Sequence, residues 1–345
     1  MSDVTVNASD ARRAELAHWI DVDLGLHGAV MVPASEDASF RRYFRIQQGG
    51  RTLIAMDAPP EREDLGPYLT VAALLERMGV HVPHVYEVDR KRGFLLLSDL
   101  GSRLYLAALT GGADPEPLYR DAAATLLTMQ SWPEAQLGAV PAYDARLLDR
   151  EVQLFPEWFL TRHLEAAPDA AQQAVVDRIS RMLAAAALGQ PQVFVHRDYH
   201  SRNLMVCAAR NPGVLDFQDA VRGAVTYDLV SLYKDCYIVW PRPRILAWLE
   251  QYRLAAQNRG LALPSRAEFV RWFDLMGVQR HLKVLGIFAR LWYRDGKPGY
   301  LADLPRVLAY VQELSGRYAE LGELDDLIKN VVEPRFSAAQ ARVGL

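Results

Sequence analysis

The stretch from Val193 to Asp228 constrains this chain more than any other part, because polar residues follow two short apolar runs in a fixed order. The first run, residues 193–195, has the length and the β-branched content of a buried strand, and Asp198 follows it closely. Asn203 lies five positions after Asp198, and a second apolar run leads directly into Asp216. Such abrupt changes from apolar to polar residues predict loops that carry functional groups.

The order of Asp198, Asn203 and Asp216 is typical of a phosphoryl-transfer site. The pattern H-x-D-x-x-x-x-N followed by D-F matches the kinase arrangement, in which the first Asp accepts a hydroxyl proton. The Asn and the second Asp then supply oxygen ligands for Mg²⁺ on the ATP phosphates. The alternative is that these residues only cap local turns.

Three motifs in this stretch, HRDYH, DFQDA and TYDLVSLY, resemble those of the aminoglycoside phosphotransferase and choline kinase superfamily. The resemblance implies an α+β, protein-kinase-like fold with a small antiparallel-sheet N-lobe and a large, mainly helical C-lobe. It also implies ATP as co-substrate and Mg²⁺ as cofactor. By the same resemblance, His196 supports the catalytic loop, and Asp228 ties that loop from the start of the following helix.

Composition limits the classes of partner. The chain has 345 residues, a formal charge of -3 and 50% hydrophobic residues, which permits a large core and argues against a nucleic-acid partner. The N-terminus has no apolar signal core, and no apolar stretch is long enough to cross a bilayer, so we expect a cytoplasmic location and no membrane association. Cys207 and Cys236 are too few for a disulfide framework. No obligate protein partner is inferred.

Residues 1–98 are predicted to form the N-lobe. A helix capped by Ser9 or Asp10 extends to about Leu24, and Gly49-Gly50 predicts a hairpin between two of the strands. Strands are expected over three ranges: 29–32, 42–48 and 51–56. A buried strand over residues 93–97 then ends at a hinge, where by resemblance the main chain of Ser98 and Leu100 binds the adenine edge.

The phosphate-binding elements differ from those of the superfamily. There is no glycine-rich phosphate loop, Met56 and Asp57 stand where relatives generally have a lysine, and residues 67–69 occupy the place of its glutamate partner. The loop 35–39 is the candidate substitute for the phosphate loop. We expect an arginine to replace the lysine, the candidates being Arg41, Arg42 and Arg45, whereas the alternative is a solvated hairpin with basic flanks.

Residues 99–345 are predicted to form one helical C-lobe that holds the catalytic loop, the metal loop and the sugar site. Apolar residues recur at helical spacing over six ranges: 116–130, 144–164, 170–188, 244–259, 265–294 and 304–321. In the second range, Glu151 and Trp158 are candidates for contacts to a sugar, although such aromatic residues more often belong to a core.

A basic stripe is predicted in the fifth of these ranges. With Ile287 completing the series, its members recur at alternating three- and four-residue intervals up to three residues past this range, so in a helix they share one face: Arg280, Lys283, Arg290, Arg294 and Lys297. Attraction of an anionic substrate group is one interpretation, with Arg280, Lys283 and Arg290 as the candidates, and a solvated helix face is the other.

The segment QRHLKVLGIFARL, together with YRDGK and GYL, narrows the resemblance to the bacterial N-acetylmuramate and N-acetylglucosamine anomeric kinases of peptidoglycan recycling. This resemblance implies ATP-dependent phosphorylation of the anomeric hydroxyl of the amino sugar, giving a sugar 1-phosphate. An aminoglycoside kinase, or another small-molecule hydroxyl kinase, is the first alternative. A non-catalytic, nucleotide-binding pseudokinase scaffold is the second.

Overall fold

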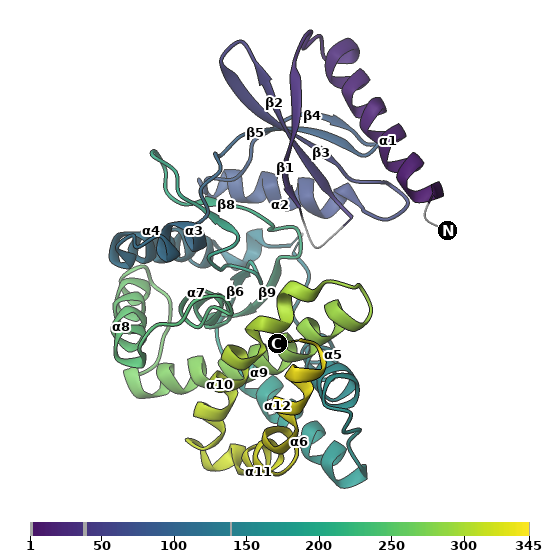
Figure 1. Ribbon diagram of the computed structural model, residues 1–345. Coiled ribbons are helices and arrows are strands. Elements are labelled where there is room, and N and C mark those ends of the chain that lie inside the picture. The colour runs from purple at the N-terminus through teal and green to yellow at the C-terminus, as the bar shows by residue number, and fades with distance from the viewer. Residues whose placement is uncertain (1–2, 37–39, 139, 345) are drawn as a thin grey trace. The chain divides into compact units, whose positions relative to one another are not determined.

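The computed structural model describes residues 3–36, 40–138 and 140–344. The chain forms two compact units, residues 1–103 with 205–219 and residues 104–204 with 220–345 (Figure 1). The sequence placed a single lobe boundary between residues 98 and 99. In the structure the segment 205–219, which carries the predicted metal loop, belongs to the first unit.

The first unit is built on a five-stranded antiparallel sheet with the strand order β1-β2-β3-β5-β4. Its strands are β1 (Val30–Glu36), β2 (Arg42–Gln48), β3 (Arg51–Asp57), β4 (Val85–Asp89) and β5 (Phe94–Ser98). Gly49 and Gly50 connect β2 to β3 with φ values of 54° and 80°, which suit a tight hairpin and are unfavourable for other residues. The predicted hairpin is confirmed by the pairing of Gln48 with Arg51.

Helices complete this unit. Leu16 and Trp19, from the end of α1 (Asp3–His18) and from the π-helical turn η1 (Trp19–Asp23), pack on side chains of β2, β3 and β5. The predicted cap at Ser9 or Asp10 is wrong, because the helix begins at Asp3. Ser and Asp occur inside helices as well as at their starts, so the residue type alone does not fix the boundary. A second helix, α2 (Leu65–Arg77), is capped by the side chain of Asp64.

The second unit is mainly helical. Its α-helices are α3 (Tyr105–Thr110), α4 (Pro115–Gln130), α5 (Ala145–Val152), α6 (Ala170–Leu188), α7 (Tyr227–Tyr233), α8 (Arg242–Asn258), α9 (Arg266–Tyr293), α10 (Leu304–Ser315), α11 (Gly322–Leu327) and α12 (Glu333–Arg342). Short 3-10 and π segments join them, namely η2 (Glu134–Gln136), η3 (Phe155–His163), η4 (Pro298–Asp303), η5 (Ala319–Leu321) and η6 (Ile328–Val332). The strands β6 (Gln192–Val195) and β9 (Val221–Ala224) pair antiparallel, and β7 (Leu204–Met205) pairs with β8 (Gly213–Val214).

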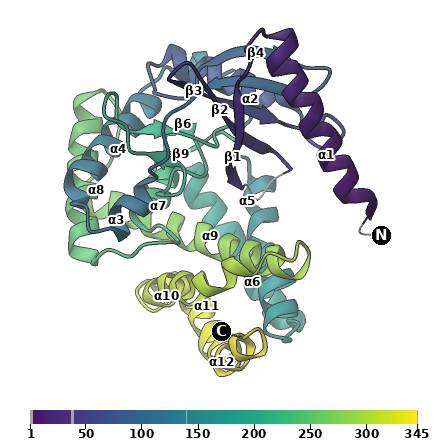
Figure 2. The same cartoon turned by 45° about the horizontal axis from the view of Figure 1, so that its top comes forward.

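Helix α9 organises the second unit. It is 28 residues long, and it packs against η3, α6, α7 and α10, as Figures 1 and 2 show. A Cβ atom at Gly286 would lie 2.3 Å from the carbonyl carbon of Leu154, so the absence of a side chain allows α9 to approach the chain just before η3. None of the helices in the described ranges combines the length and the apolar run needed to span a bilayer.

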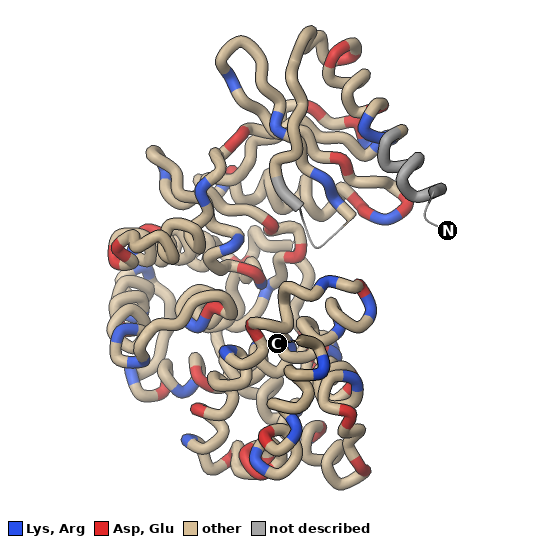
Figure 3. The backbone as a smooth tube through the Cα atoms, in the orientation of Figure 1, with Lys and Arg blue, Asp and Glu red and all other residues tan. Residues whose placement is uncertain are grey.

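One predicted helix is divided in the structure. Residues 144–164 were expected to form a single helix, but α5 ends at Val152 and a π-helical segment follows from Phe155. Pro156 lacks the N–H group that would continue the α-helical pattern, which explains the change of winding. Basic and acidic residues alternate along both units without long segments of one sign (Figure 3), in keeping with the small net charge.

Candidate active site

The predicted catalytic loop begins where β6 ends. The carboxylate of Asp228, in the first turn of α7, accepts hydrogen bonds from the main-chain N–H of His196 (Oδ2, 2.6 Å) and of Arg197 (Oδ1, 3.0 Å). Arg197 has a φ of 75°, which is unfavourable for a residue with a side chain and persists only where neighbours fix the backbone. Asp228 therefore holds the loop in a strained conformation immediately before Asp198. Burial raises the pKa of Asp228 to about 7, against the opposing effect of the two N–H groups.

Asp198 lies in this loop with its carboxylate near a guanidinium and an imidazole. Its Oδ1 is 3.6 Å from Nη2 of Arg280 and 4.0 Å from Nε2 of His200. Its main chain is held on both sides, since its N–H donates to Nδ1 of His196 (3.3 Å) and its carbonyl accepts from Nδ2 of Asn203 (3.0 Å). Burial alone would raise the pKa of the Asp198 carboxyl, but Arg280 and the other cations nearby hold that pKa well below its usual range. Asp198 is therefore ionised, as a base must be.

A buried charged network lies behind Asp198. The carboxylate of Glu151 accepts hydrogen bonds from Arg197, Tyr143 and Lys283, with 2.9 Å between Nζ of Lys283 and Oε1. Burial opposes ionisation of Glu151, but Lys283 and Arg197 keep its pKa below the ordinary value. Lys283 also donates to the Tyr227 hydroxyl at 3.0 Å. Lys283 and Arg197 therefore keep the carboxylate of Glu151 ionised although it is buried.

Arg280 joins this network to the catalytic loop. Its Nη1 donates to the carbonyl oxygen of Arg197 (2.9 Å) and to the hydroxyl of Tyr227 (3.2 Å). Arg280 and Lys283 are 3% and 6% exposed, so the interpretation of the basic stripe as a solvated helix face is wrong for these two residues. The stripe is also shorter than predicted, because α9 ends at Tyr293 and Arg294 and Lys297 lie beyond it. Spacing cannot show which helix face is buried when the helix lies inside the molecule.

Two other candidate substrate residues, Trp158 and Arg290, have contacts in the described residues that do not connect them to Asp198. Trp158 is half-buried and packs against the hydrophobic core of the second unit, as the alternative interpretation of such aromatic residues has it. Arg290 is half-buried near the end of α9, with no contact that connects it to the catalytic loop in the described part of the chain. The roles of Glu151, Trp158, Arg280, Lys283 and Arg290 toward a substrate remain predictions. Arg197, Tyr143 and Tyr227 were not predicted, because long-range contacts alone reveal them.

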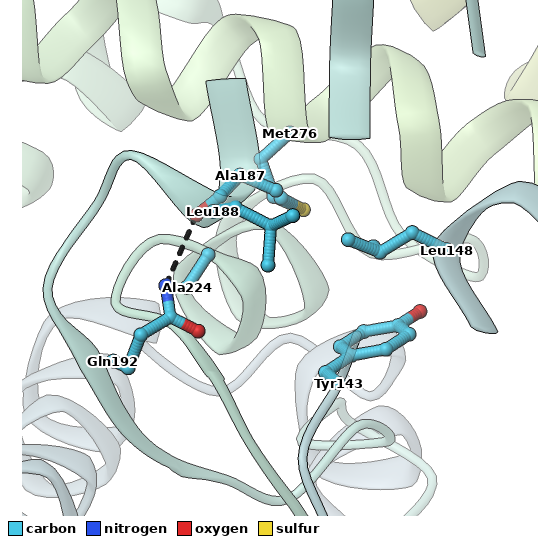
Figure 4. Close-up of a pocket in the computed structure, with 7 residues that line it drawn as sticks. All are labelled: Tyr143, Leu148, Ala187, Leu188, Gln192, Ala224 and Met276. Carbon is cyan, nitrogen blue, oxygen red and sulfur yellow. Dashed lines mark hydrogen bonds between the residues drawn. The ribbon is translucent and has the colours of Figure 1, made fainter. Parts of the chain in front are cut away.

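An apolar pocket adjoins the buried network on the side of Tyr143 (Figure 4). Its lining is made by Tyr143, Leu148, Ala187, Leu188, Gln192, Ala224 and Met276. The side-chain N–H of Gln192 donates a hydrogen bond to the carbonyl oxygen of Ala187 at 3.1 Å. A lining with so few polar groups does not suit a sugar, whose hydroxyls need hydrogen-bond partners.

Asp216, the predicted metal ligand, lies in the first unit. It has a φ of 60°, a second strained position at a loop with proposed function. Its Oδ1 accepts a hydrogen bond from Nε2 of Gln218 at 2.8 Å and lies 3.4 Å from Nη2 of Arg41. Nε of Arg41 lies 3.9 Å from Oε2 of Glu63, which precedes the cap of α2.

A cation–carboxylate pair lies beside Asp216, although neither member stands at the position expected from the superfamily. Arg41 is 9% exposed, and its guanidinium lies close to both Asp216 and Glu63. Glu63 was not predicted, because it precedes the first turn of α2, whereas the usual glutamate was expected near residues 67–69. The replacement of the superfamily lysine by an arginine stays a prediction.

The other two arginine candidates have different partners. Nε of Arg42 donates to Oδ2 of Asp57 and Nε of Arg12 to Oδ1, both at 3.0 Å, and Asp57 is fully buried. Arg45 binds Asp99 through Nε and Oδ2 at 2.7 Å. Asp57 is thus neutralised by two arginines, whereas Arg41 contacts Asp216.

The predicted hinge shows two main-chain groups that are already hydrogen-bonded. The N–H of Ser98 donates to the carbonyl of His84 at 2.9 Å, and the carbonyl of Leu100 accepts from Sγ of Cys207 at 3.5 Å. Adenine binding at this hinge remains a prediction. It requires main-chain groups other than the N–H of Ser98 and the carbonyl of Leu100. Residues 37–39 of the loop proposed to cover the phosphates lie outside the described residues.

The residues proposed for Mg²⁺ fit a hard cation. Nδ2 of Asn203 is used on the carbonyl of Asp198, so the amide oxygen is the atom that Asn203 can offer, and Asp216 offers carboxylate oxygen. In residues 3–36, 40–138 and 140–344 no three His, Cys, Asp or Glu side chains form a cluster suited to a metal. The oxygen atoms of Asn203 and Asp216 suit Mg²⁺, which takes few protein ligands and completes its shell with phosphate and water.

The sheet-and-helix architecture, with a loop of this geometry after β6, defines a kinase-like phosphotransferase. The chain belongs to the family described as "Phosphotransferase enzyme family", which matches residues 30–269. Solved structures with the same fold include an ethanolamine kinase from Plasmodium vivax (TM-score 0.66, 9% identity, 89% of this chain and 90% of that chain covered). A choline kinase from Streptococcus pneumoniae is another (TM-score 0.61, 12% identity, 87% and 99% covered).

More similar sequences carry a more specific name. A Pseudomonas aeruginosa protein named N-acetylmuramate/N-acetylglucosamine kinase is 48% identical over 335 residues, covering 94% of this chain and 98% of the relative. A protein of the same name from Neisseria meningitidis is 41% identical, with 93% and 96% covered. The predicted resemblance to this group of kinases is confirmed.

Proposed function

We propose that this protein transfers the γ-phosphoryl group of ATP to the anomeric hydroxyl of N-acetylmuramate and N-acetylglucosamine. The products are sugar 1-phosphates, formed in the cytoplasm during recycling of peptidoglycan. The observation that carries the substrate assignment is the 48% identity, over nearly the whole of both chains, to a kinase named for these two sugars. The proposed catalytic geometry comes from the loop around Asp198.

The environment of Asp198 suits an anomeric hydroxyl. Asp198 is a weak base, because Arg280 and its neighbours lower its pKa. An anomeric hydroxyl is attached to a carbon that also bonds the ring oxygen, so it is more acidic than an ordinary alcohol and asks less of its base. Orientation of the hydroxyl and neutralisation of phosphate charge then supply most of the rate.

Asn203 and Asp216 are the residues that we propose to hold Mg²⁺. When bound, the ion neutralises charge on the ATP phosphates. Arg41 adds a second positive charge beside Asp216, and Glu63 keeps its guanidinium in place. Asp228 supports catalysis indirectly, by holding the loop that presents Asp198.

The aminoglycoside-kinase alternative is less consistent with the charges around Asp198. A polycationic acceptor needs carboxylates near the base, whereas Arg280, Lys283 and Arg197 surround Asp198. The pseudokinase alternative is less consistent with the presence of Asp198, Asn203 and Asp216 together, since a scaffold that only binds nucleotide does not need the proposed base.

Consumption of ATP with Mg²⁺ tests the proposal against a panel of N-acetylmuramate, N-acetylglucosamine, plain hexoses, choline and aminoglycosides. We expect turnover with the two amino sugars and loss of their reducing end in the product. Asp198→Asn should lower kcat by about 100-fold to 10,000-fold, the usual contribution of a general base, with little change in the KM for ATP. Turnover of an aminoglycoside but of neither amino sugar, or Asp198→Asn at the unaltered rate, contradicts the proposal.

A further inference from the structure

Arg202 is an exposed arginine in the catalytic loop, immediately before Asn203. Its guanidinium carbon lies over the ring of Tyr237, 4.0 Å from the centroid, and 5.7 Å from the centroid of Tyr300. Stacking on an aromatic face positions a guanidinium while its N–H groups, which lie in the plane of the group, stay directed outward. We call Tyr237 and Tyr300 the aromatic platform of Arg202.

Arg202 forms no ion pair within 4.0 Å in the described ranges, although its charge acts at longer range on Asp303. Asp303, at the end of η4, is bound by Arg306 with 2.5 Å between Nη1 and Oδ1. Most arginines around the site differ in this respect: Arg197 and Arg280 are both paired with acids. Arg202 is therefore available to bind an anion that comes from outside the chain.

The position of Arg202 is fixed before any ligand binds. Asp235, which is 1% exposed, accepts hydrogen bonds from the N–H of Ser201 and from the N–H of Tyr237, each at 2.9 Å. One buried carboxylate thus holds both the loop that carries Arg202 and the first ring of its platform. Tyr237 and Tyr300 also pack against the hydrophobic core of the second unit. A site ordered in this way loses little side-chain entropy when it binds.

Arg202 lies close to the proposed base. The ring of His200 contacts that of Tyr237 edge to face, with 5.4 Å between centroids, and Nε2 of His200 is 4.0 Å from Oδ1 of Asp198. Arg202 follows Asp198 by four positions, so their Cα atoms are at most about 14 Å apart. The contacts through Tyr237 and His200 connect the guanidinium of Arg202 to the carboxylate of Asp198.

We infer that Arg202, on its aromatic platform, binds the lactyl carboxylate of N-acetylmuramate while the anomeric hydroxyl lies at Asp198. This inference rests on the proposed function and deepens it, because it assigns a residue to the one group that distinguishes the two sugars. The planar guanidinium matches the planar carboxylate with paired hydrogen bonds. N-acetylglucosamine lacks the lactyl group and makes no use of this contact.

The test measures kcat/KM for both sugars with the unaltered enzyme and with Arg202→Met. We expect the ratio of kcat/KM for N-acetylmuramate to that for N-acetylglucosamine to fall about tenfold, the loss typical of a charged hydrogen bond. Arg202→Lys, which keeps the charge but not the planar fork, should recover part of the ratio. The matched control is Arg181→Met, because Arg181 is exposed on α6 and should leave the ratio unchanged.

The methyl ester of N-acetylmuramate provides a second readout, because it removes the charge from the substrate. Its turnover relative to N-acetylglucosamine should be the same in the unaltered enzyme and in Arg202→Met. An unchanged ratio for the free acid, or an equal loss for both sugars, overturns the assignment of Arg202 and leaves the proposed function intact. Turnover of neither sugar by the unaltered enzyme overturns the proposed function, and the inference with it.

Discussion

Arg280 shows how a residue remote in sequence can set the chemistry of a catalytic group. It is separated from Asp198 by 82 positions, yet Nη2 of Arg280 lies 3.6 Å from the Asp198 carboxylate, and Nη1 binds the carbonyl of Arg197. The arginine therefore affects both the charge and the position of the proposed base. A positioning role of this kind predicts a change in pH dependence as well as in rate.

Arg280→Met should raise the pKa of Asp198, because the nearest cation is removed. In the unaltered enzyme the lowered pKa keeps Asp198 ionised as the pH falls. Protonation of Asp198 therefore reduces activity only in strongly acidic solution. In the variant, that loss should begin at higher pH, and kcat near neutrality should fall. Measurement of kcat against pH, over the range in which both proteins stay folded, tests this.

The matched control is Arg280→Lys, which retains a positive charge and should shift the acidic limb less. Identical acidic limbs for the unaltered enzyme and Arg280→Met would show that Arg280 does not govern the ionisation of Asp198. A loss of kcat without any shift of the acidic limb would indicate that Arg280 has a purely structural role.

Arg41 and Arg42 are adjacent in sequence but should give different results. Arg41→Ala removes the cation beside Asp216 and should raise the KM for ATP by about tenfold or more, since a hydrogen bond to a charged group is typically worth about 1.5–3 kcal/mol. Arg42→Ala leaves the buried Asp57 with one arginine fewer and should lower the melting temperature instead. Steady-state kinetics and thermal unfolding of both variants decide this, and an unchanged KM for ATP in Arg41→Ala contradicts the proposed phosphate contact.

At the scale of elements, α9 links packing to the site, because one helix supplies Gly286, Arg280 and Lys283. Gly286→Ala would place a Cβ atom within 2.4 Å of the carbonyl oxygen of Leu154. Main-chain atoms cannot rotate away as a side chain can, so we expect a loss of about 1–3 kcal/mol in unfolding free energy. Thermal or urea unfolding measures this loss.

Gly277 on the same helix is the control. A Cβ atom there would meet its nearest neighbour, Cδ1 of Leu314, at 3.6 Å, which is an ordinary contact. Gly277→Ala should therefore be neutral, or stabilising by up to about 1 kcal/mol through helix propensity. Equal stability of the two variants would contradict the close approach of α9 to Leu154.

The sequence predicted elements better than it predicted their surroundings. The spacing of apolar residues and the positions of glycine and proline located the β2–β3 hairpin and the helix over residues 170–188. Both elements depend on local residue choices. The burial of Arg280 and Lys283, and the partnership of Arg41 with Glu63, could not be predicted in this way. Each depends on which distant element covers the side chain, and polar residues at helical spacing look alike in either case.

At the scale of the whole molecule, the chain divides differently from the boundary expected at residue 98. The segment 205–219, which carries Asp216, belongs to the first unit. The sequence could not reveal this, because the segment returns to the first unit more than a hundred residues after that boundary. The last prediction concerns the effect of Asp216 on the stability of the folded chain.

A ligand that binds the folded chain raises its melting temperature, by an amount equivalent to about 2.7 kcal/mol when its concentration is 100 times its Kd. We expect ATP with Mg²⁺ to raise the melting temperature more than ATP with a chelator. Asp216→Asn should lose most of the Mg²⁺-dependent part, because it removes an anionic ligand of the cation at nearly constant shape. Asp198→Asn is the control and should keep that part, since Asp198 is proposed to act on the hydroxyl rather than on the metal. Thermal unfolding of the three proteins, with and without chelator, separates the two roles: a full Mg²⁺-dependent shift in Asp216→Asn would exclude Asp216 as a ligand, whereas its loss in Asp198→Asn would assign the metal to the catalytic loop instead.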